Sequence, residues 1–225
     1  MYCAVPTVLV MMQPDFGTAF VFICIMVFIY FIGRISWGYI LTAAGGLAVC
    51  MPLAYYFVLS DSQRERIDVF INPESDLQNS GYNVAQSKIA IGSGQLTGKG
   101  FFSEGTLAQL RFVPERHTDF IFAGIVEGLG FVGGTIIICL FFALIFRWIY
   151  IAMRTKDSFG TCLVVGVAGM FTAHVFENIG MTIGLMPVTG IPLPFISYGG
   201  SNLLTNLIGV GIVENVWMRH QSKKR

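Results

Sequence analysis

Long apolar runs separated by polar stretches dominate the hydrophobic pattern of this chain. The runs lie near residues 17–33, 36–59, 120–152, 159–186 and 199–218. A helix needs about 20 apolar residues, and at least roughly 17, to cross the hydrocarbon core of a bilayer, and each run is long enough. The pattern predicts an all-α fold: a polytopic integral membrane helix bundle with about five transmembrane helices, which forms a single membrane domain over residues 1–225.

A further apolar stretch, residues 1–12, is too short to cross a membrane and contains no basic residue. It lacks the basic start of a signal peptide. We interpret it as the end of a helix that begins upstream, and we expect the chain to be the C-terminal part of a larger protein.

Composition agrees with a membrane protein. Hydrophobic residues make up 54% of the chain and charged residues 12%, which is about half of the roughly 25% found in soluble domains. The mean hydropathy is +0.68. A net charge of +1 offers no bulk attraction to nucleic-acid phosphates. We therefore expect membrane lipid to surround much of the surface, and we exclude nucleic acid as a partner.

Basic residues at the ends of the apolar runs predict the orientation. One side carries Arg34, Arg147, Arg154, Lys156, Arg219, Lys223, Lys224 and Arg225. By the positive-inside rule this side faces the cytoplasm, so the C-terminus is predicted to be cytoplasmic and the 60–118 loop extracellular. Trp37, Trp148 and Trp217 lie within three residues of these arginines, where we expect an interfacial aromatic belt.

The 60–118 loop is predicted to contain short interfacial helices. Ser80 is a suitable N-cap for an amphipathic helix over residues 81–91 that lies on the outer leaflet. Its apolar side would carry Tyr82, Ala85, Ile89 and Ala90. The glycine-rich residues 92–100 that follow have two interpretations. They form either a flexible turn between interfacial segments or a nest of backbone N–H groups that binds a diphosphate together with Lys99.

The densest group of polar side chains comes directly before the third apolar run. It consists of Glu115, Arg116, His117, Thr118 and Asp119. Hydrocarbon cannot solvate a carboxylate, so an ionisable residue at the edge of a membrane helix is a candidate for function, and Asp119 is our first candidate. The alternative is structural, because Thr118 and Asp119 could cap the helix that follows.

A second polar segment, residues 187–201, is predicted on the same outer side. It contains three prolines, which break a helix, and the hydroxyl groups of Ser197, Tyr198 and Ser201. Membrane proteins place polar backbone near a substrate by interrupting a helix beside a cavity. We expect this segment to lie beside such a cavity.

Three polar residues inside the apolar runs also have alternative interpretations. His174 and Glu177 lie one helical turn apart, and they are either two metal ligands or a buried hydrogen-bonded pair. Two ligands do not make a site, so no metal site is predicted. Glu127 either extends a polar cleft from Asp119 or bonds a neighbouring helix.

Four motifs spread along the chain carry a resemblance to a known family. They are Q-P-D-F-G-T at 13–18, Q-S-K-I-A-I-G-S-G at 86–94, P-E-R-H-T-D-F at 114–120 and P-L-P-F-I-S-Y-G-G-S at 192–201. These motifs resemble the SEDS proteins (shape, elongation, division, sporulation), most closely the RodA branch. The resemblance implies a peptidoglycan glycosyltransferase of the bacterial cell membrane. Such an enzyme polymerises lipid II, the undecaprenyl-diphosphate-linked disaccharide peptide, together with a class B penicillin-binding transpeptidase.

The resemblance also implies that the family's essential extracellular aspartate is Asp119, which would act as general base on a sugar hydroxyl. The residues predicted to bind the substrate are Lys88, Lys99, Arg111, Glu115, Arg116, His117, Ser197, Tyr198 and Ser201. A divalent cation, Mg or Mn, would be an alternative source of positive charge at the diphosphate. Two other functions fit the same residues: a flippase or transporter of a lipid-linked precursor, and a non-catalytic scaffold for the transpeptidase.

Cysteine labelling tests the predicted orientation. A cysteine introduced at Gln78, in the 60–118 loop, should react with a membrane-impermeant thiol reagent in intact cells. A cysteine at Ser222 should react only after the cells are opened. The unsubstituted protein is the control for the native cysteines, and labelling of Ser222→Cys from outside would contradict the orientation.

Overall fold

The computed structural model describes residues 4–11, 13, 15–32, 61–72, 80–100 and 118–222, with isolated positions between 38 and 55. The regular elements are α1 (Ala4–Met11), α2 (Phe16–Ile32), α4 (Asp61–Ile71), α5 (Ser80–Ser93), α7 (Ile121–Arg154), α8 (Ser158–Ile183) and α9 (Gly200–Ser222). All of these elements are helices, which confirms the all-α prediction for the described residues. The predicted run 36–59 lies almost entirely outside them and stays a prediction.

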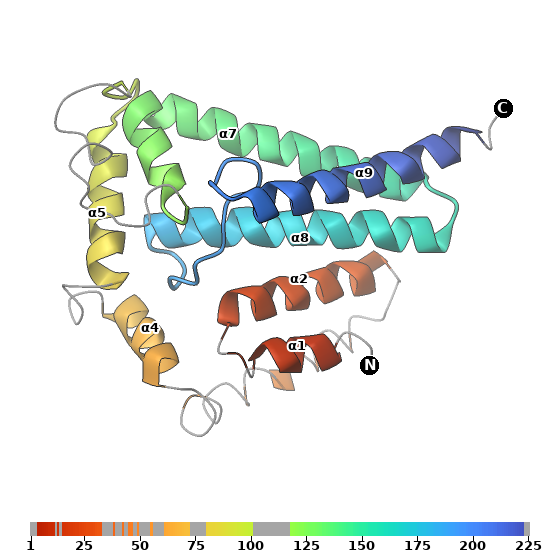
Figure 1. Cartoon of the computed structure of the whole chain (residues 1–225), viewed down its shortest axis with the longest axis horizontal. Coiled ribbons are helices and arrows are strands. Elements are labelled where there is room, and N and C mark those ends of the chain that lie inside the picture. Colours follow the sequence, from red (N-terminus) through yellow and green to blue (C-terminus); the bar gives the residue numbers. More distant parts are fainter. Residues whose placement is uncertain are drawn as a thin grey trace.

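The helices α2, α7, α8 and α9 coincide with predicted apolar runs. In Figure 1, α2 and α7 lie on either side of α8, and α9 runs along α8. Of the described helices, α7 and α8 are long and apolar enough to cross a membrane, and α2, with 17 residues, is a shorter apolar helix. α8 contacts all three of the others. It is therefore the central helix of this part of the chain.

The main apolar core lies where α7, α8 and α9 meet. It includes Trp148 and Ile151 of α7, Phe171 of α8 and Val213 of α9. Trp148 is 1% exposed, and its ring meets that of Phe171 edge-on with centroids 4.7 Å apart, a favourable aromatic geometry. Trp148, which we expected in an interfacial belt, therefore packs inside the bundle and not on its surface. Its neighbour Arg147 marks the end of a run, but the helix turns the tryptophan inward.

α7 is two helical segments joined at Gly130. Gly130 has φ 72° and ψ −173°, a combination that residues with a side chain rarely adopt. In Figure 1 the short first segment runs beside α5, and the chain then turns into the long second segment. Gly134 faces the side chain of Val126 across this bend, where a Cβ atom would be only 2.7 Å from Val126 Cγ2. Gly134 therefore permits a close approach between the two segments of α7.

The glycine-rich loop, residues 94–100, provides hydrogen-bond partners for backbone groups of α7 that lose their helical partners at this bend. A continuous helix would pair the amides of residues 131 and 132 with the carbonyls of residues 127 and 128. Each of these four groups instead bonds the loop. The amides of Lys99 and Gly100 donate to Glu127 O and Gly128 O (both 3.0 Å), and the amides of Phe131 and Val132 donate to Gln95 O (2.8 Å) and Leu96 O (3.2 Å).

Glycine is required at both centres of this contact. Gly98 (φ +79°) and Gly130 (φ +72°) lie in the left-handed region, and their backbones touch. A Cβ atom on Gly98 would overlap Gly128 O, and one on Gly130 would overlap the Gly98 amide nitrogen. We call residues 94–100 the clamp loop, because they hold the two segments of α7 together.

α5 is confirmed as a helix, and one side of it packs against the protein. Ala85 is exposed and Ile89 is 60% exposed, whereas Val84, Ser87 and Ala90 are buried against the protein. Ser87 Oγ donates to Thr182 O at the end of α8 (2.6 Å). A serine thus faces inward and pairs a carbonyl at the end of α8, where a helix leaves its last carbonyls without partners of its own. α5 lies across the ends of α7 and α8 (Figure 1).

The clamp predicts a large difference between two glycine substitutions. Gly98→Ala should lower the free energy of unfolding by roughly 1–3 kcal/mol from backbone strain alone, and by more because the methyl group meets the backbone of Gly128. Gly124→Ala, in the first segment of α7, is the matched control. No atom lies within 4 Å of its added Cβ, and alanine favours a helix by about 0.5–1 kcal/mol over glycine. Thermal unfolding in detergent measures both, and equal melting temperatures would contradict the clamp.

Candidate functional site

The segment that follows α8 turns back into the protein and lies against it. α8 ends at Gly184, which adopts the left-handed conformation (φ 76°) of a helix C-cap. We call residues 185–199 the returning loop. Within it, Ile191 and Ser197 are buried and Leu193 is 0% exposed, so the loop occupies the interior at the same end of the bundle as the start of α7 (Figure 1).

Three polar side chains of α8 hold the returning loop. His174 Nδ1 lies 3.2 Å from Pro192 O, Thr189 Oγ1 donates to Glu177 Oε1 (2.9 Å), and Asn178 Nδ2 donates to Ile191 O (2.8 Å). A carbonyl oxygen can only accept, so His174 donates from Nδ1. These hydrogen bonds of His174 and Glu177 each go to the returning loop, and do not join the two side chains as a pair.

Asp119 lies in the turn just before α7, two residues ahead of Ile121, and against the returning loop. Its main-chain oxygen accepts from Asn178 Nδ2 (2.9 Å). Its carboxylate Oδ2 is 3.4 Å from the place where a Cβ atom would stand on Gly190. The N-cap of α7 is Phe120, whose side chain makes no capping hydrogen bond. The N-cap position that the structural alternative assigned to Thr118 or Asp119 is therefore filled by an apolar residue.

A cavity of about 470 Å³ borders this arrangement. Its walls come from α2, α4, α8 and the returning loop: Asp15, Thr18, Val21, Phe22, Ile25, Arg66, Met170, His174, Thr189, Gly190, Ile191 and Pro192. Gly190 belongs to the wall, and a Cβ atom on it would be in van der Waals contact with the Asp119 carboxylate. The prediction that the 187–201 segment lies beside a cavity is confirmed, and Asp119 stands one residue behind the wall.

The cavity has a polar side and an apolar side. Arg66 brings a guanidinium group, and its Nη1 lies 3.5 Å from Val188 O of the returning loop. Asp15 accepts hydrogen bonds from the amide (3.0 Å) and hydroxyl (2.6 Å) of Thr18, so it caps α2. The apolar side belongs to Val21, Phe22 and Ile25 of α2 with Met170 of α8. A ligand with a charged head and a long apolar tail matches both sides.

The predicted substrate-binding residues have different outcomes. Arg111, Glu115, Arg116 and His117 lie outside the described residues and stay predictions. Tyr198 is 82% exposed and Ser201 is exposed in the first turn of α9. Ser197 is buried, and its hydroxyl donates to Thr118 O (2.6 Å) while it accepts from the Leu193 amide (2.7 Å). A hydroxyl has one proton, so Ser197 has none left to donate to a substrate.

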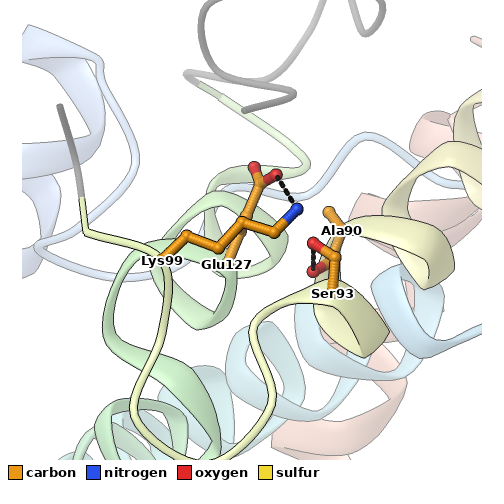
Figure 2. Close-up of polar contacts among 4 residues, drawn as sticks. All are labelled: Ala90, Ser93, Lys99 and Glu127. Atoms are coloured by element: carbon orange, nitrogen blue, oxygen red, sulfur yellow. Dashed lines mark hydrogen bonds and ion pairs between the residues drawn. The ribbon is translucent and has the colours of Figure 1, made fainter. Parts of the chain in front are cut away.

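Lys88 and Lys99, the two predicted cations that the structure describes, both lie against the protein. The Lys88 side chain passes over Gly184, where a methyl group would overlap its Cε and Nζ atoms. This placement brings a positive charge to the C-terminal end of α8, which the helix dipole favours. Lys99 Nζ lies 3.9 Å from Glu127 Oε1, and the Glu127 side chain is 3% exposed. Figure 2 shows Lys99 reaching Glu127 from the clamp loop.

The interpretation of residues 92–100 as an anion nest is wrong for the amides of Gly98, Lys99 and Gly100. The amide of Gly98 donates to Gly94 O (2.8 Å), and those of Lys99 and Gly100 donate to α7 carbonyls. Figure 2 also shows Ser93 Oγ donating to Ala90 O at the end of α5 (2.8 Å). These donors already have acceptors, so they cannot surround a diphosphate. Glu127 forms its ion pair with Lys99 of the clamp loop, so this ion pair does not join Glu127 to a neighbouring helix.

Two residues of this region, Asn178 and Arg66, were missed by the sequence analysis. Asn178 follows His174 by four residues, and this helical spacing was a usable signal that both side chains share a face. Arg66 lies in a segment of alternating charge, residues 61–68, which is typical of a solvated surface. Nothing in the local pattern indicated that Arg66 reaches the returning loop.

Comparison with known proteins establishes the class. A family of cell cycle proteins that comprises FtsW, RodA and SpoVE matches residues 1–222. The chain belongs to this family of membrane proteins. It is 45% identical over 211 residues to the peptidoglycan glycosyltransferase MrdB of Escherichia coli K12, covering 94% of this chain and 57% of MrdB. It is 42% identical over 215 residues to the stage V sporulation protein E of Bacillus subtilis 168, covering 92% of this chain and 56% of that protein.

Two solved structures share the fold. One belongs to a peptidoglycan synthase complex that coordinates polymerization and crosslinking; it matches with a TM-score of 0.78 and 30% identity, over 97% of this chain and 61% of that chain. The other is an aspartate-to-alanine mutant of the rod shape determining protein RodA of Thermus thermophilus, with a TM-score of 0.60 and 25% identity, over 97% of this chain and 54% of that chain. The chain spans a little more than half the length of MrdB and of the sporulation protein.

The bond between Glu177 and Thr189 predicts that Glu177 acts on stability. Glu177 Oε2 is buried without a hydrogen-bond partner among the described residues. Glu177→Gln would place an amide N–H₂ group there with no acceptor, which costs about 1–3 kcal/mol. Thermal unfolding in detergent should show this loss, whereas Glu214→Gln, at an exposed position of α9, should leave the melting temperature unchanged. An unchanged melting temperature for Glu177→Gln would contradict the assignment.

Proposed function

We propose that this chain carries the catalytic aspartate of a peptidoglycan glycosyltransferase that polymerises lipid II during cell elongation. The observation that carries the proposal is the place of Asp119. Its carboxylate Oδ2 is 3.4 Å from the place of a Cβ atom on Gly190, and Gly190 is part of the wall of the 470 Å³ cavity. Family membership supports the activity, because the relative MrdB is a peptidoglycan glycosyltransferase.

The proposed reaction joins two lipid-linked sugars. A hydroxyl oxygen of one sugar forms a bond with the anomeric carbon of the other, and the bond from that carbon to the diphosphate oxygen breaks. The hydroxyl proton passes to the Asp119 carboxylate, which acts as general base. Undecaprenyl diphosphate leaves with the bonding electron pair. The negative charge that it gains must be offset by positive groups near the site.

Among the described residues, Arg66 is our candidate for a positive group near the diphosphate, because it lines the cavity. Arg111 and Arg116 stay candidates from the sequence. No three His, Cys, Asp or Glu side chains within the described residues group closely enough to hold a metal ion. A divalent cation, Mg or Mn, would therefore be held mainly by the diphosphate itself. Its participation is part of the proposal and is tested by adding a chelator to the assay.

The membrane setting of the proposal follows from the same cavity. Val21, Phe22, Ile25 and Met170 offer an apolar wall along which an isoprenoid tail would lie. We propose a multi-pass protein of the bacterial cell membrane with about five spans in this chain, an extracellular 60–118 loop and a cytoplasmic C-terminus. A class B penicillin-binding transpeptidase is the proposed partner, in line with the complex of polymerization and crosslinking whose structure the fold matches.

The flippase alternative has less support from these contacts. It requires intramembrane carboxylates such as Glu127 and Glu177 along a path for the substrate. Glu127 pairs with Lys99, and Glu177 accepts from Thr189. Both bonds hold loops in place. The scaffold alternative gives the Asp119 carboxylate beside the cavity no role.

Substitution of Asp119 tests the catalytic proposal. Asp119→Asn keeps the shape of the side chain and the backbone bond to Asn178, so the protein should reach the membrane at its usual level. Loss of the general base should slow polymerisation by roughly 10²–10⁴-fold. The measurement is glycan formation from purified lipid II by the protein as its gene encodes it, with a transpeptidase present and protein amounts matched.

The matched control is Asp157→Asn at the other end of the bundle. Asp157 caps α8 by accepting from the Gly160 amide (2.9 Å), and asparagine caps equally well. This variant should keep the wild-type rate. An Asp119→Asn protein that retains half of the wild-type rate would end the assignment of Asp119 as base.

A further inference from the structure

The backbone on both sides of Asp119 is held by buried side chains. The carbonyl before its Cα atom, Thr118 O, accepts from Ser197 Oγ (2.6 Å). The carbonyl after it, Asp119 O, accepts from Asn178 Nδ2 (2.9 Å). Peptide units are planar, so fixing these two carbonyls fixes the φ and ψ angles of Asp119. The direction of its Cα–Cβ bond, from which the carboxylate extends, is fixed with them.

Asn178 also fixes the surface against which that carboxylate lies. Its Nδ2 donates both to Asp119 O and to Ile191 O (2.8 Å). Ile191 follows Gly190, the residue next to the Asp119 carboxylate. One amide group therefore sets the separation between the main chain of Asp119 and the wall of the cavity. The reversed amide would point Oδ1 at two carbonyl oxygens, so only the observed orientation is favourable.

Stability alone is a poor explanation for this asparagine. Asn178 is 0% exposed, and its Oδ1 atom is buried without a hydrogen-bond partner among the described residues. A buried polar atom left unpaired is costly, and native proteins contain few of them. A residue that accepts this cost while bridging two segments at a candidate active site has a positional purpose.

We propose that Asn178 is a positioning residue for Asp119, and that Ser197 has the same role from the other side. The inference rests on the proposed function, because it assumes that the Asp119 carboxylate takes a proton. Neither side chain touches the substrate. Both act by holding the base at the distance and angle that proton transfer needs, where a displacement of about 1 Å costs on the order of 100-fold in rate.

Steady-state kinetics on lipid II, with the protein as its gene encodes it, test the inference. Asn178→Ala should lower kcat by about 100-fold and leave KM within about twofold, because substrate contacts are intact. Ser197→Ala should lower kcat in the same way, and Ser197→Thr, which keeps the hydroxyl, should recover most of it. This recovery distinguishes positioning from a general loss of packing. All rates are normalised to folded protein, measured as the monodisperse fraction in detergent.

Asn206→Ala is the matched control. Asn206 is also a buried asparagine, 1% exposed, but its Nδ2 bonds Asn202 Oδ1 within α9 (3.0 Å). It should keep the wild-type kcat per folded molecule. The inference fails if Asn178→Ala keeps half of the wild-type kcat, if its effect falls on KM, or if Asn206→Ala loses as much. Failure of the proposed function has a separate signature, in which Asp119→Asn itself keeps polymerising.

Discussion

Backbone amides and carbonyls inside a membrane protein need partners from the protein, because hydrocarbon offers none. This constraint is met in two ways where the helices of this chain stop or break. At Gly130 the clamp loop supplies the four partners that α7 loses. After Gly184 the returning loop takes its partners from polar side chains of α8, including Asn178. Irregular backbone is thereby kept in the interior, where a site can be built from it.

The clamp loop and Asn178 hold opposite ends of the short first segment of α7. The first segment of α7 is held at Gly130 by the clamp loop, and at Asp119 by Asn178. Because neither end is free, the angle between this segment and the rest of α7 is set by hydrogen bonds to other parts of the chain. The proposed role of Asp119 as base requires such a fixed position, since a base works only at a defined distance from its proton.

Local patterns predicted the helices well and their breaks only in part. Apolar runs located α2, α7, α8 and α9, and the prolines of residues 187–201 located the returning loop. The bend at Gly130 was missed, because its partners lie some 30 residues earlier in the sequence and no local pattern reports them. Ser87 and Trp148 face inward for the same reason. Their orientation depends on what another helix presents, and this is a tertiary property.

One glycine of the returning loop lies between the Asp119 carboxylate and the cavity, because Gly190 lines the cavity and a Cβ atom on it would stand 3.4 Å from Asp119 Oδ2. Gly190 has φ +78° and no side chain. Any larger residue would adopt this conformation only with strain, and its side chain would stand beside the carboxylate. The returning loop therefore has two separate tasks here. Its hydrogen bonds to α8 hold it beside the main chain of Asp119, and the glycine at residue 190 leaves room for the Asp119 carboxylate.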